Sequence, residues 1–105
     1  MDKKVKILTK KEIDDALYRL PGWSHVDDKV SKEYVFESFS DGIKLIDTLA
    51  PFCNQIDHHP DIHIFYKKIR FDLQRFDVGG KVTDRDIVVA RKIEELYQEM
   101  YPEKE

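Results

Sequence analysis

The stretch DIHIFYKKIRFDL, residues 61–73, is the part of the sequence that most clearly predicts the fold. Residues 61–66 are rich in β-branched and aromatic side chains, which favour an extended strand. The Lys67-Lys68 pair that follows could form a tight hairpin turn, although neither lysine favours the positive φ of such turns. Apolar residues then alternate with polar ones, as they do in a strand with one buried face: Ile69, Phe71 and Leu73.

A second hairpin is predicted upstream of this stretch. Residues 23–26 suggest a short strand, and Asp27-Asp28-Lys29 suggest its turn. Residues 30–37 suggest a longer strand, in which Val30, Tyr34 and Phe36 share one parity and Ser31, Glu33 and Glu37 share the other. We therefore expect one face of this strand to be buried.

Three helices are predicted around the two hairpins. Thr9 and Glu12 form a capping-box pattern ahead of the first helix, which runs up to Pro21-Gly22. The second helix follows a cap at residues 38–41, and its apolar stripe is Ile43, Ile46, Leu49, Ala50 and Cys53. The third helix follows a cap at residues 83–86, and its stripe is Ile87, Ala90, Ile93, Leu96 and Met100.

Pro51 falls inside the second apolar stripe. An interior proline removes one backbone hydrogen bond and costs roughly 3 kcal/mol in an isolated helix. We therefore expect either a kink at Pro51 or a helix that restarts there. Cys53, further along the same stripe, is expected to be an inert core residue.

The order α-β-β-α-β-β-α predicts an α+β fold. Short connections favour antiparallel pairing, so we expect a four-stranded antiparallel sheet with the helices packed on one face. The other face would stay open for a ligand or a partner subunit. A chain of 105 residues fits a single domain over residues 1–105, with a modest core that oligomerisation would help to stabilise.

Composition narrows the class of protein. The net charge of -3 gives no electrostatic reason to expect direct binding of nucleic acid. No stretch approaches the roughly 18 apolar residues of a membrane span, and the N-terminus lacks the apolar run of a signal peptide. A single cysteine cannot form an intrachain disulfide and suits a reducing compartment. We therefore expect a soluble, cytoplasmic protein.

Three of the four histidines lie within six residues: His58, His59 and His63. Imidazole titrates near neutrality, so the cluster suggests proton transfer or metal binding, and Asp57 and Asp61 could add ligands. Histidines that bind metal on regular structure usually come at i,i+4 or alternating spacing, and the proline after His59 disrupts the helical spacing. We therefore favour proton transfer over a metal site, with a polar loop carrying chance histidines as the alternative.

Three further residues are candidates for a site. Asp86 begins the last helix, where its carboxylate could complete a capping box, act in catalysis, or do both. Phe76 has the strand parity of the polar residues, so it would line a pocket or a subunit contact unless the strand bulges or ends before it. Tyr66 would serve either in packing or as a pocket wall.

Together these residues resemble the pterin-4a-carbinolamine dehydratase family, also known as DCoH, the dimerization cofactor of a homeodomain transcription factor. The similar positions, in chain order, are Gly22-Trp23, Tyr34, Phe36, Phe39, His58-His59-Pro60, Tyr66, Gly79-Gly80, Val82-Thr83 and Asp86. Two positions depart from the family pattern. Asn54 stands where the family usually has a charged residue or a histidine, and Phe76 stands where it commonly has His and sometimes Trp.

The resemblance implies a lyase, a 4a-hydroxytetrahydrobiopterin dehydratase that recycles a pterin cofactor. It would remove water from 4a-hydroxytetrahydropterin and give the quinonoid dihydropterin, with no metal or redox cofactor. His58 and His59 would be the acid/base pair, and Asp86 would orient or charge-stabilise one of them. The implied substrate contacts are Tyr66, Phe76, Asp57 and Asp61.

The resemblance also implies a homotetramer, arranged as a dimer of dimers. Asn54 and Phe76 motivate an alternative, because neither supplies the group that the family usually has. In that alternative the chain is a catalytically weak member that binds a pterin in the same cleft, or binds a protein partner through the same fold, as a coactivator does.

Overall fold

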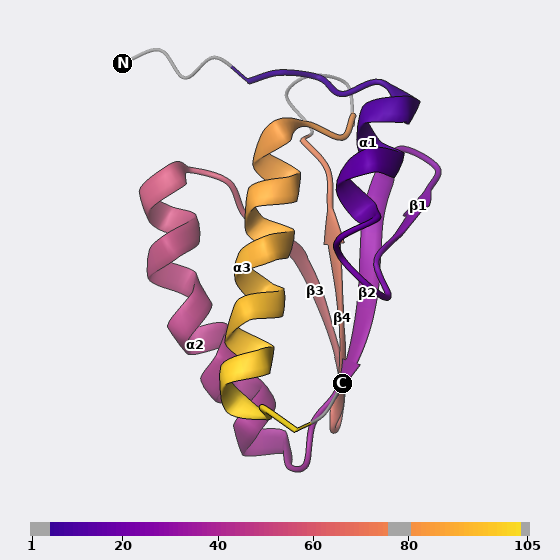
Figure 1. The fold of residues 1–105 in the computed structure, drawn as a ribbon. Helices are drawn as coiled ribbons and strands as arrows, with labels where there is room; N and C mark the ends of the chain where they lie inside the picture. Colours follow the sequence, from indigo (N-terminus) through magenta and orange to yellow (C-terminus); the bar gives the residue numbers. More distant parts are fainter. Residues whose placement is uncertain (1–4, 76–80, 104–105) are drawn as a thin grey trace.

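The elements follow the predicted order α-β-β-α-β-β-α (Figure 1). The computed structural model describes residues 5–75 and 81–103. The four strands form one antiparallel sheet in the order β1-β2-β4-β3, which confirms the α+β fold class. The elements are α1 (Lys10–Leu17), β1 (Ser24–Val26), β2 (Lys29–Val35), α2 (Phe39–Ile56), β3 (Asp61–Phe65), β4 (Lys68–Leu73) and α3 (Asp84–Met100).

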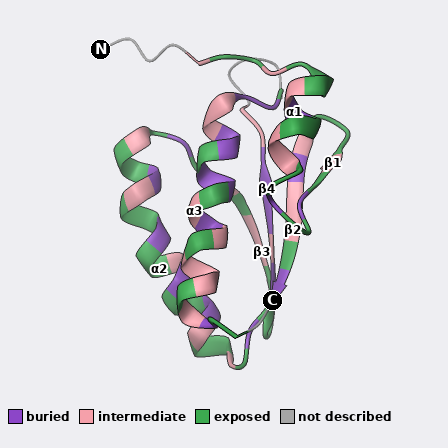
Figure 2. Ribbon diagram, viewed as in Figure 1, coloured by how far each residue is buried: buried purple, intermediate pink, exposed green. Residues whose placement is uncertain are grey.

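The core lies between the sheet and the helices. α2 and α3 run side by side against one face of the sheet, and α1 lies beside β1 (Figure 1). Buried residues are concentrated along β4 and on the inner sides of α2 and α3 (Figure 2). As the alternation predicts, the apolar residues of β4 are fully buried: Ile69, Phe71 and Leu73. This burial is the largest source of stability, since each such side chain contributes about 1.5–3 kcal/mol.

The turn between β3 and β4 lies one residue earlier than predicted. Phe65 pairs with Lys68, so the two turn residues are Tyr66 and Lys67, and the predicted Lys67-Lys68 turn is wrong. A two-residue hairpin needs a residue with positive φ, and Tyr66 takes it with φ of 60°. The pairing of the apolar residues across β3 and β4 therefore outweighs the local preference of the turn residue.

The buried side of α2 also differs from the predicted stripe. Leu49 and Cys53 are buried as expected, but Ile43 is 40% exposed and Ala50 is exposed. The buried set is Gly42, Leu45, Leu49 and Cys53. Gly42 contributes to this choice, because a Cβ atom there would lie 2.7 Å from Ile69 Cδ1 and the buried Ile69 side chain would have to shift.

Pro51 does not break α2. The helix runs from Phe39 to Ile56, so the predicted restart at Pro51 is wrong. Pro51 is exposed, so the carbonyl group that loses its helical partner, that of Asp47, lies on an exposed stretch of the helix. Water can then replace the missing donor at small cost.

Other differences are confined to the ends of elements. The Thr9 and Glu12 capping box is present, but α1 ends at Leu17, and tighter i→i+3 hydrogen bonds replace the last predicted turn. Trp23 precedes β1, and Phe36 follows β2, although both are buried as part of the core. Among the described residues no helix is long and apolar enough to cross a membrane.

The sheet face away from α2 and α3 carries a polar cluster. Its centre is Asp72, which is only 4% exposed and accepts a hydrogen bond of 2.6 Å from Ser31 Oγ. Three basic side chains lie within 4 Å of its carboxylate: Lys29, His63 and Arg70. Burial alone would raise the pKa of Asp72, but the Ser31 hydroxyl and these neighbours hold that pKa below its usual value.

Candidate active site

The double histidine follows a sharp change of chain direction at the end of α2. Asp57 takes the left-handed conformation, with φ of 55° and ψ of 50°, and its N–H bonds back to the carbonyl groups of Asn54 and Cys53. The His58 N–H likewise bonds to the Cys53 carbonyl at 3.1 Å. This turn directs His58 into the protein, where it is 5% exposed, and leaves His59 exposed.

His58 is paired with Asp86. The His58 Nε2 atom makes a short hydrogen bond to Asp86 Oδ1, and Asp86 is fully buried in the first turn of α3. The other carboxylate oxygen, Oδ2, accepts the Thr83 N–H at 2.7 Å and the Thr83 hydroxyl at 3.3 Å. One carboxylate therefore caps α3 and holds the histidine at the same time, so the two interpretations of Asp86 are structurally compatible.

His59 has a different partner. Its Nε2 atom lies 2.9 Å from Asn54 Oδ1, one turn earlier on α2. The amide oxygen accepts the Nε2–H, which leaves the lone pair of Nδ1 as the basic site of this ring. The sequence marked Asn54 only as a departure from a family pattern, whereas the structure makes it the residue that orients His59.

Two arginines that the sequence analysis did not select complete the end of α2. Arg75 Nη1 lies 3.3 Å from the Asp57 carbonyl oxygen and 3.5 Å from His58 Nδ1. Arg85 Nη1 lies 2.8 Å from the Ile56 carbonyl oxygen. The last carbonyl groups of a helix lack partners and favour cations, and the last turn of α2 contains no basic residue of its own. This lack of a basic residue in the last turn of α2 was the one sequence feature that could have pointed to cations from elsewhere in the chain.

The remaining predicted residues are dispersed. Asp57 is exposed beside His58, and Asp61 is exposed at the start of β3. Tyr66 is 70% exposed at the β3–β4 turn, so β3 separates it from His59 by about 20 Å along the strand. Phe76 and the Gly79-Gly80 pair lie outside the described residues. The structure thus brings together His58, His59 and Asp86, with Asp57 alongside, but not Tyr66.

The third histidine of the cluster belongs elsewhere. His63 Nε2 lies 3.1 Å from Asp72 Oδ2, in the polar cluster on the far face of the sheet. Within residues 5–75 and 81–103, no group of three or more His, Cys, Asp or Glu side chains is arranged to hold a metal ion.

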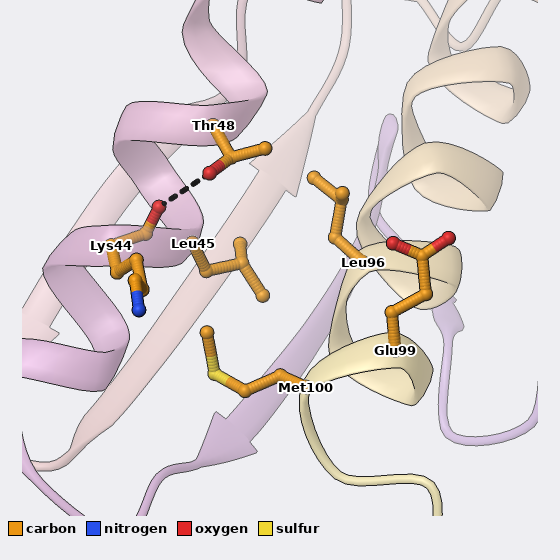
Figure 3. Close-up of a pocket in the computed structure, with 6 residues that line it drawn as sticks. All are labelled: Lys44, Leu45, Thr48, Leu96, Glu99 and Met100. Atoms are coloured by element: carbon orange, nitrogen blue, oxygen red, sulfur yellow. Dashed lines mark hydrogen bonds between the residues drawn. The ribbon is translucent and has the colours of Figure 1, made fainter.

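A pocket of about 380 Å³ lies between α2 and α3, but far from the histidines (Figure 3). Its apolar lining comes from Leu45, Leu96 and Met100, and Lys44 and Glu99 stand at its sides. Thr48 donates a hydrogen bond of 3.0 Å to the Lys44 carbonyl and completes the lining. Thr48 precedes the end of α2 by eight residues, or about 12 Å along the helix axis, so this pocket is not part of the histidine site.

Comparison with known proteins adds independent evidence. The family model described as pterin 4 alpha carbinolamine dehydratase matches residues 6–96. A protein of Sulfurisphaera tokodaii, provisionally named pterin-4-alpha-carbinolamine dehydratase, is 36% identical over 92 residues, covering 88% of this chain and 98% of its own. A similarly named protein of Nocardia farcinica is 38% identical over 91 residues, covering 87% of this chain and 95% of its own.

A solved structure is similar over nearly the same region. The crystal structure of a transcriptional coactivator/pterin dehydratase from Brucella melitensis superimposes with a TM-score of 0.81. It is 30% identical in sequence, and the match covers 87% of this chain and 98% of the other. The residues around His58, His59 and Asp86 lie within the range matched by the family model.

Proposed function

The chain belongs to the pterin 4 alpha carbinolamine dehydratase family, and from this we propose that it dehydrates 4a-hydroxytetrahydropterin to the quinonoid dihydropterin, recycling a pterin cofactor. One observation carries the proposal: a buried His58–Asp86 pair is followed in the chain by an exposed His59, whose imidazole is oriented by Asn54. Such an arrangement suits proton transfer near neutral pH, because imidazole can both donate and accept a proton there.

The reaction needs one acid and one base. The C4a–O bond breaks as the hydroxyl takes up a proton and leaves as water, and a ring proton departs as the new C=N double bond forms. The protons balance and nothing is oxidised or reduced, so the reaction can proceed with side-chain acids and bases alone. His58 and His59 are the proposed acid/base pair of this site, and Asp86 orients His58.

Within that pair, His59 is the better placed to exchange a proton with substrate. It is exposed, and its Nδ1 lone pair is left available when Nε2–H bonds to Asn54. Asp57 and Asp61 flank the two histidines and are proposed to contact the polar edge of the pterin. Phe76 is proposed as an apolar wall that stacks on the flat heterocycle.

Tyr66 can join this site only from another subunit, because it lies at the far end of β3. We propose a homotetramer, a dimer of dimers, as the functional form. Exposed apolar side chains on α2 and at the strand ends support an assembly: Phe39, Ile43, Val35 and Phe65. Light scattering should give a mass near four times the 12.5 kDa subunit, and a monomer alone would contradict the proposal.

A dehydration assay with 4a-hydroxytetrahydropterin tests the activity. The parent should exceed the spontaneous rate, and His59→Ala should lower that excess by roughly 10²–10⁴-fold. His25→Ala, a histidine on β1 away from the site, should leave the rate unchanged. If His58→Ala, His59→Ala and the double variant all retain the parental rate while folded, the proposed site is wrong.

The binding alternative rests on Asn54, a neutral amide that cannot supply a proton near pH 7. The name of the Brucella melitensis protein, which includes a coactivator role, is consistent with a protein partner. A pterin titration beside the assay separates the two functions. A parent that binds pterin without exceeding the spontaneous rate, with a Phe76→His variant that does exceed it, would show a binding member of the family.

A further inference from the structure

We propose that Arg75 is a positioning residue that, together with Asp86, locks His58 in the tautomer with its proton on Nε2. The proposal concerns the state of the His58 ring itself. It therefore stands or falls independently of whether the protein dehydrates a pterin.

The contact with Asp86 indicates the protonation of one ring nitrogen, Nε2. An ionised carboxylate can only accept hydrogen bonds, so His58 Nε2 must carry the proton in the short bond to Asp86 Oδ1. The carboxylate cannot turn away, because Thr83 N–H and the Thr83 hydroxyl both donate to its other oxygen. Asp86 and Thr83 are fully buried, so water does not compete for these atoms.

The contact with Arg75 indicates the protonation of the other ring nitrogen, Nδ1. A guanidinium group can only donate, so the contact of 3.5 Å between Arg75 Nη1 and His58 Nδ1 favours an unprotonated Nδ1. A proton on Nδ1 would point at a cation and would also oppose it electrostatically. The two partners of His58, one on each nitrogen, therefore demand the same tautomer.

Arg75 is held in place by contacts with two other segments of the chain. Its backbone N–H bonds to the Lys81 carbonyl at 2.9 Å in an isolated antiparallel bridge. Its guanidinium also donates to the carbonyl of Asp57, the residue before His58, at 3.3 Å. Arg75 thus connects the end of β4 with the left-handed turn that carries His58, and it cannot shift without disturbing that turn.

The charges around His58 come from three segments. Asp86 and Arg85 belong to α3, Arg75 follows β4, and Asp57 and His59 adjoin His58 in the chain. Arg85 bonds to the Ile56 carbonyl at 2.8 Å, whereas Arg75 bonds to the Asp57 carbonyl and also contacts the His58 ring. This difference provides a matched control.

Nitrogen-15 NMR of the histidine rings tests the proposal. In the parent at pH 7, His58 should show one protonated nitrogen, Nε2, and one unprotonated nitrogen, Nδ1. In Arg75→Met at pH 7, a measurable share of the His58 rings should carry a proton on Nδ1, because the cation that faces this nitrogen is gone. Arg75→Gln, which keeps a donor without the charge, should retain the parental pattern at pH 7.

Arg85→Met is the control for loss of helix capping. It should lower thermal stability about as much as Arg75→Met, since each removes one donor from a carbonyl at the end of α2, but the His58 pattern should not change. The proposal is overturned if the parent shows a proton on Nδ1 at pH 7. It is equally overturned if Arg75→Met leaves the pattern unchanged, or if Arg85→Met changes it as much as Arg75→Met does.

Discussion

The Asp86 carboxylate uses its two oxygens for two tasks, and both depend on its charge. One oxygen holds His58 Nε2–H, and the other accepts the Thr83 N–H at the start of α3. A neutral amide has a single acceptor oxygen, so it cannot serve both donors. The residue at position 86 therefore decides the first turn of α3 and the orientation of His58 together.

Asp86→Asn should destabilise the protein by about 3 kcal/mol, because either Thr83 N–H or His58 Nε2–H would face an amide NH₂ group in a buried site. Urea unfolding at pH 7 measures the loss. Asp84→Asn removes the same charge from the same turn, where Asp84 accepts the Lys6 N–H at an exposed site, and should cost less than about 1 kcal/mol. Equal losses from the two variants would refute this account of Asp86.

At the scale of elements, the side of α2 that faces the sheet is selected by the close approach of Gly42 to Ile69, and the apolar pattern of α2 alone does not predict it. Its apolar residues cover more than one side, and the side that faces the sheet is the one with Gly42 over Ile69. Close approach through a glycine brings Leu45 and Leu49 into the core and leaves Ile43 at the surface. The end of α2 is then held where its carbonyl groups meet Arg75 and Arg85.

Gly42→Ala should lower stability by about 1 kcal/mol, although alanine is the better helix former, because the new Cβ would lie 2.7 Å from Ile69 Cδ1. The effect can be tested by a double-mutant cycle, since Ile69→Val deletes that methyl group. The two changes together should cost less than the sum of the separate losses. Strictly additive losses would show that the contact between Gly42 and Ile69 does not limit the approach of α2.

At the scale of the whole molecule, the two faces of the sheet are stabilised by different interactions. One face is covered by α2 and α3 (Figure 1) and is apolar, as the burial of Ile69, Phe71 and Leu73 shows. The other face carries the charged groups around Asp72. The pKa of Asp72 is lowered in the folded protein, so its contribution to stability is present above the ordinary aspartate pKa of about 3.9. It is lost as the pH falls through the lower, folded value.

Asp72→Asn should therefore cost about 1–2 kcal/mol at pH 7 and should flatten the loss of stability below about pH 4. Urea unfolding at a series of pH values measures both effects. Asp61→Asn, which changes the exposed residue paired with Asp72 on β3, should reproduce neither of them. If Asp72→Asn leaves the acid limb of the stability curve as steep as in the parent, Asp72 is not its source.

Local patterns predicted much of this molecule. The alternation of Ile69, Phe71 and Leu73 and the capping signals at Thr9 and Asp86 depend on neighbours in sequence, and the structure agrees with them. The family was also evident from residues in order along the chain. The turn at Tyr66 and the buried side of α2 were mispredicted, because strand pairing and the Gly42 contact overrode local preference.

The sequence by itself determined the order of elements, the α+β class, the family and the segment that carries the histidines. Only the tertiary structure decided which histidine is buried, since His58 meets Asp86 from 28 residues away and Arg75 from 17 residues away. Adjacent histidines are equivalent in a sequence. They become different when folding surrounds one ring with a carboxylate and a guanidinium and leaves the other, held by Asn54, open to solvent.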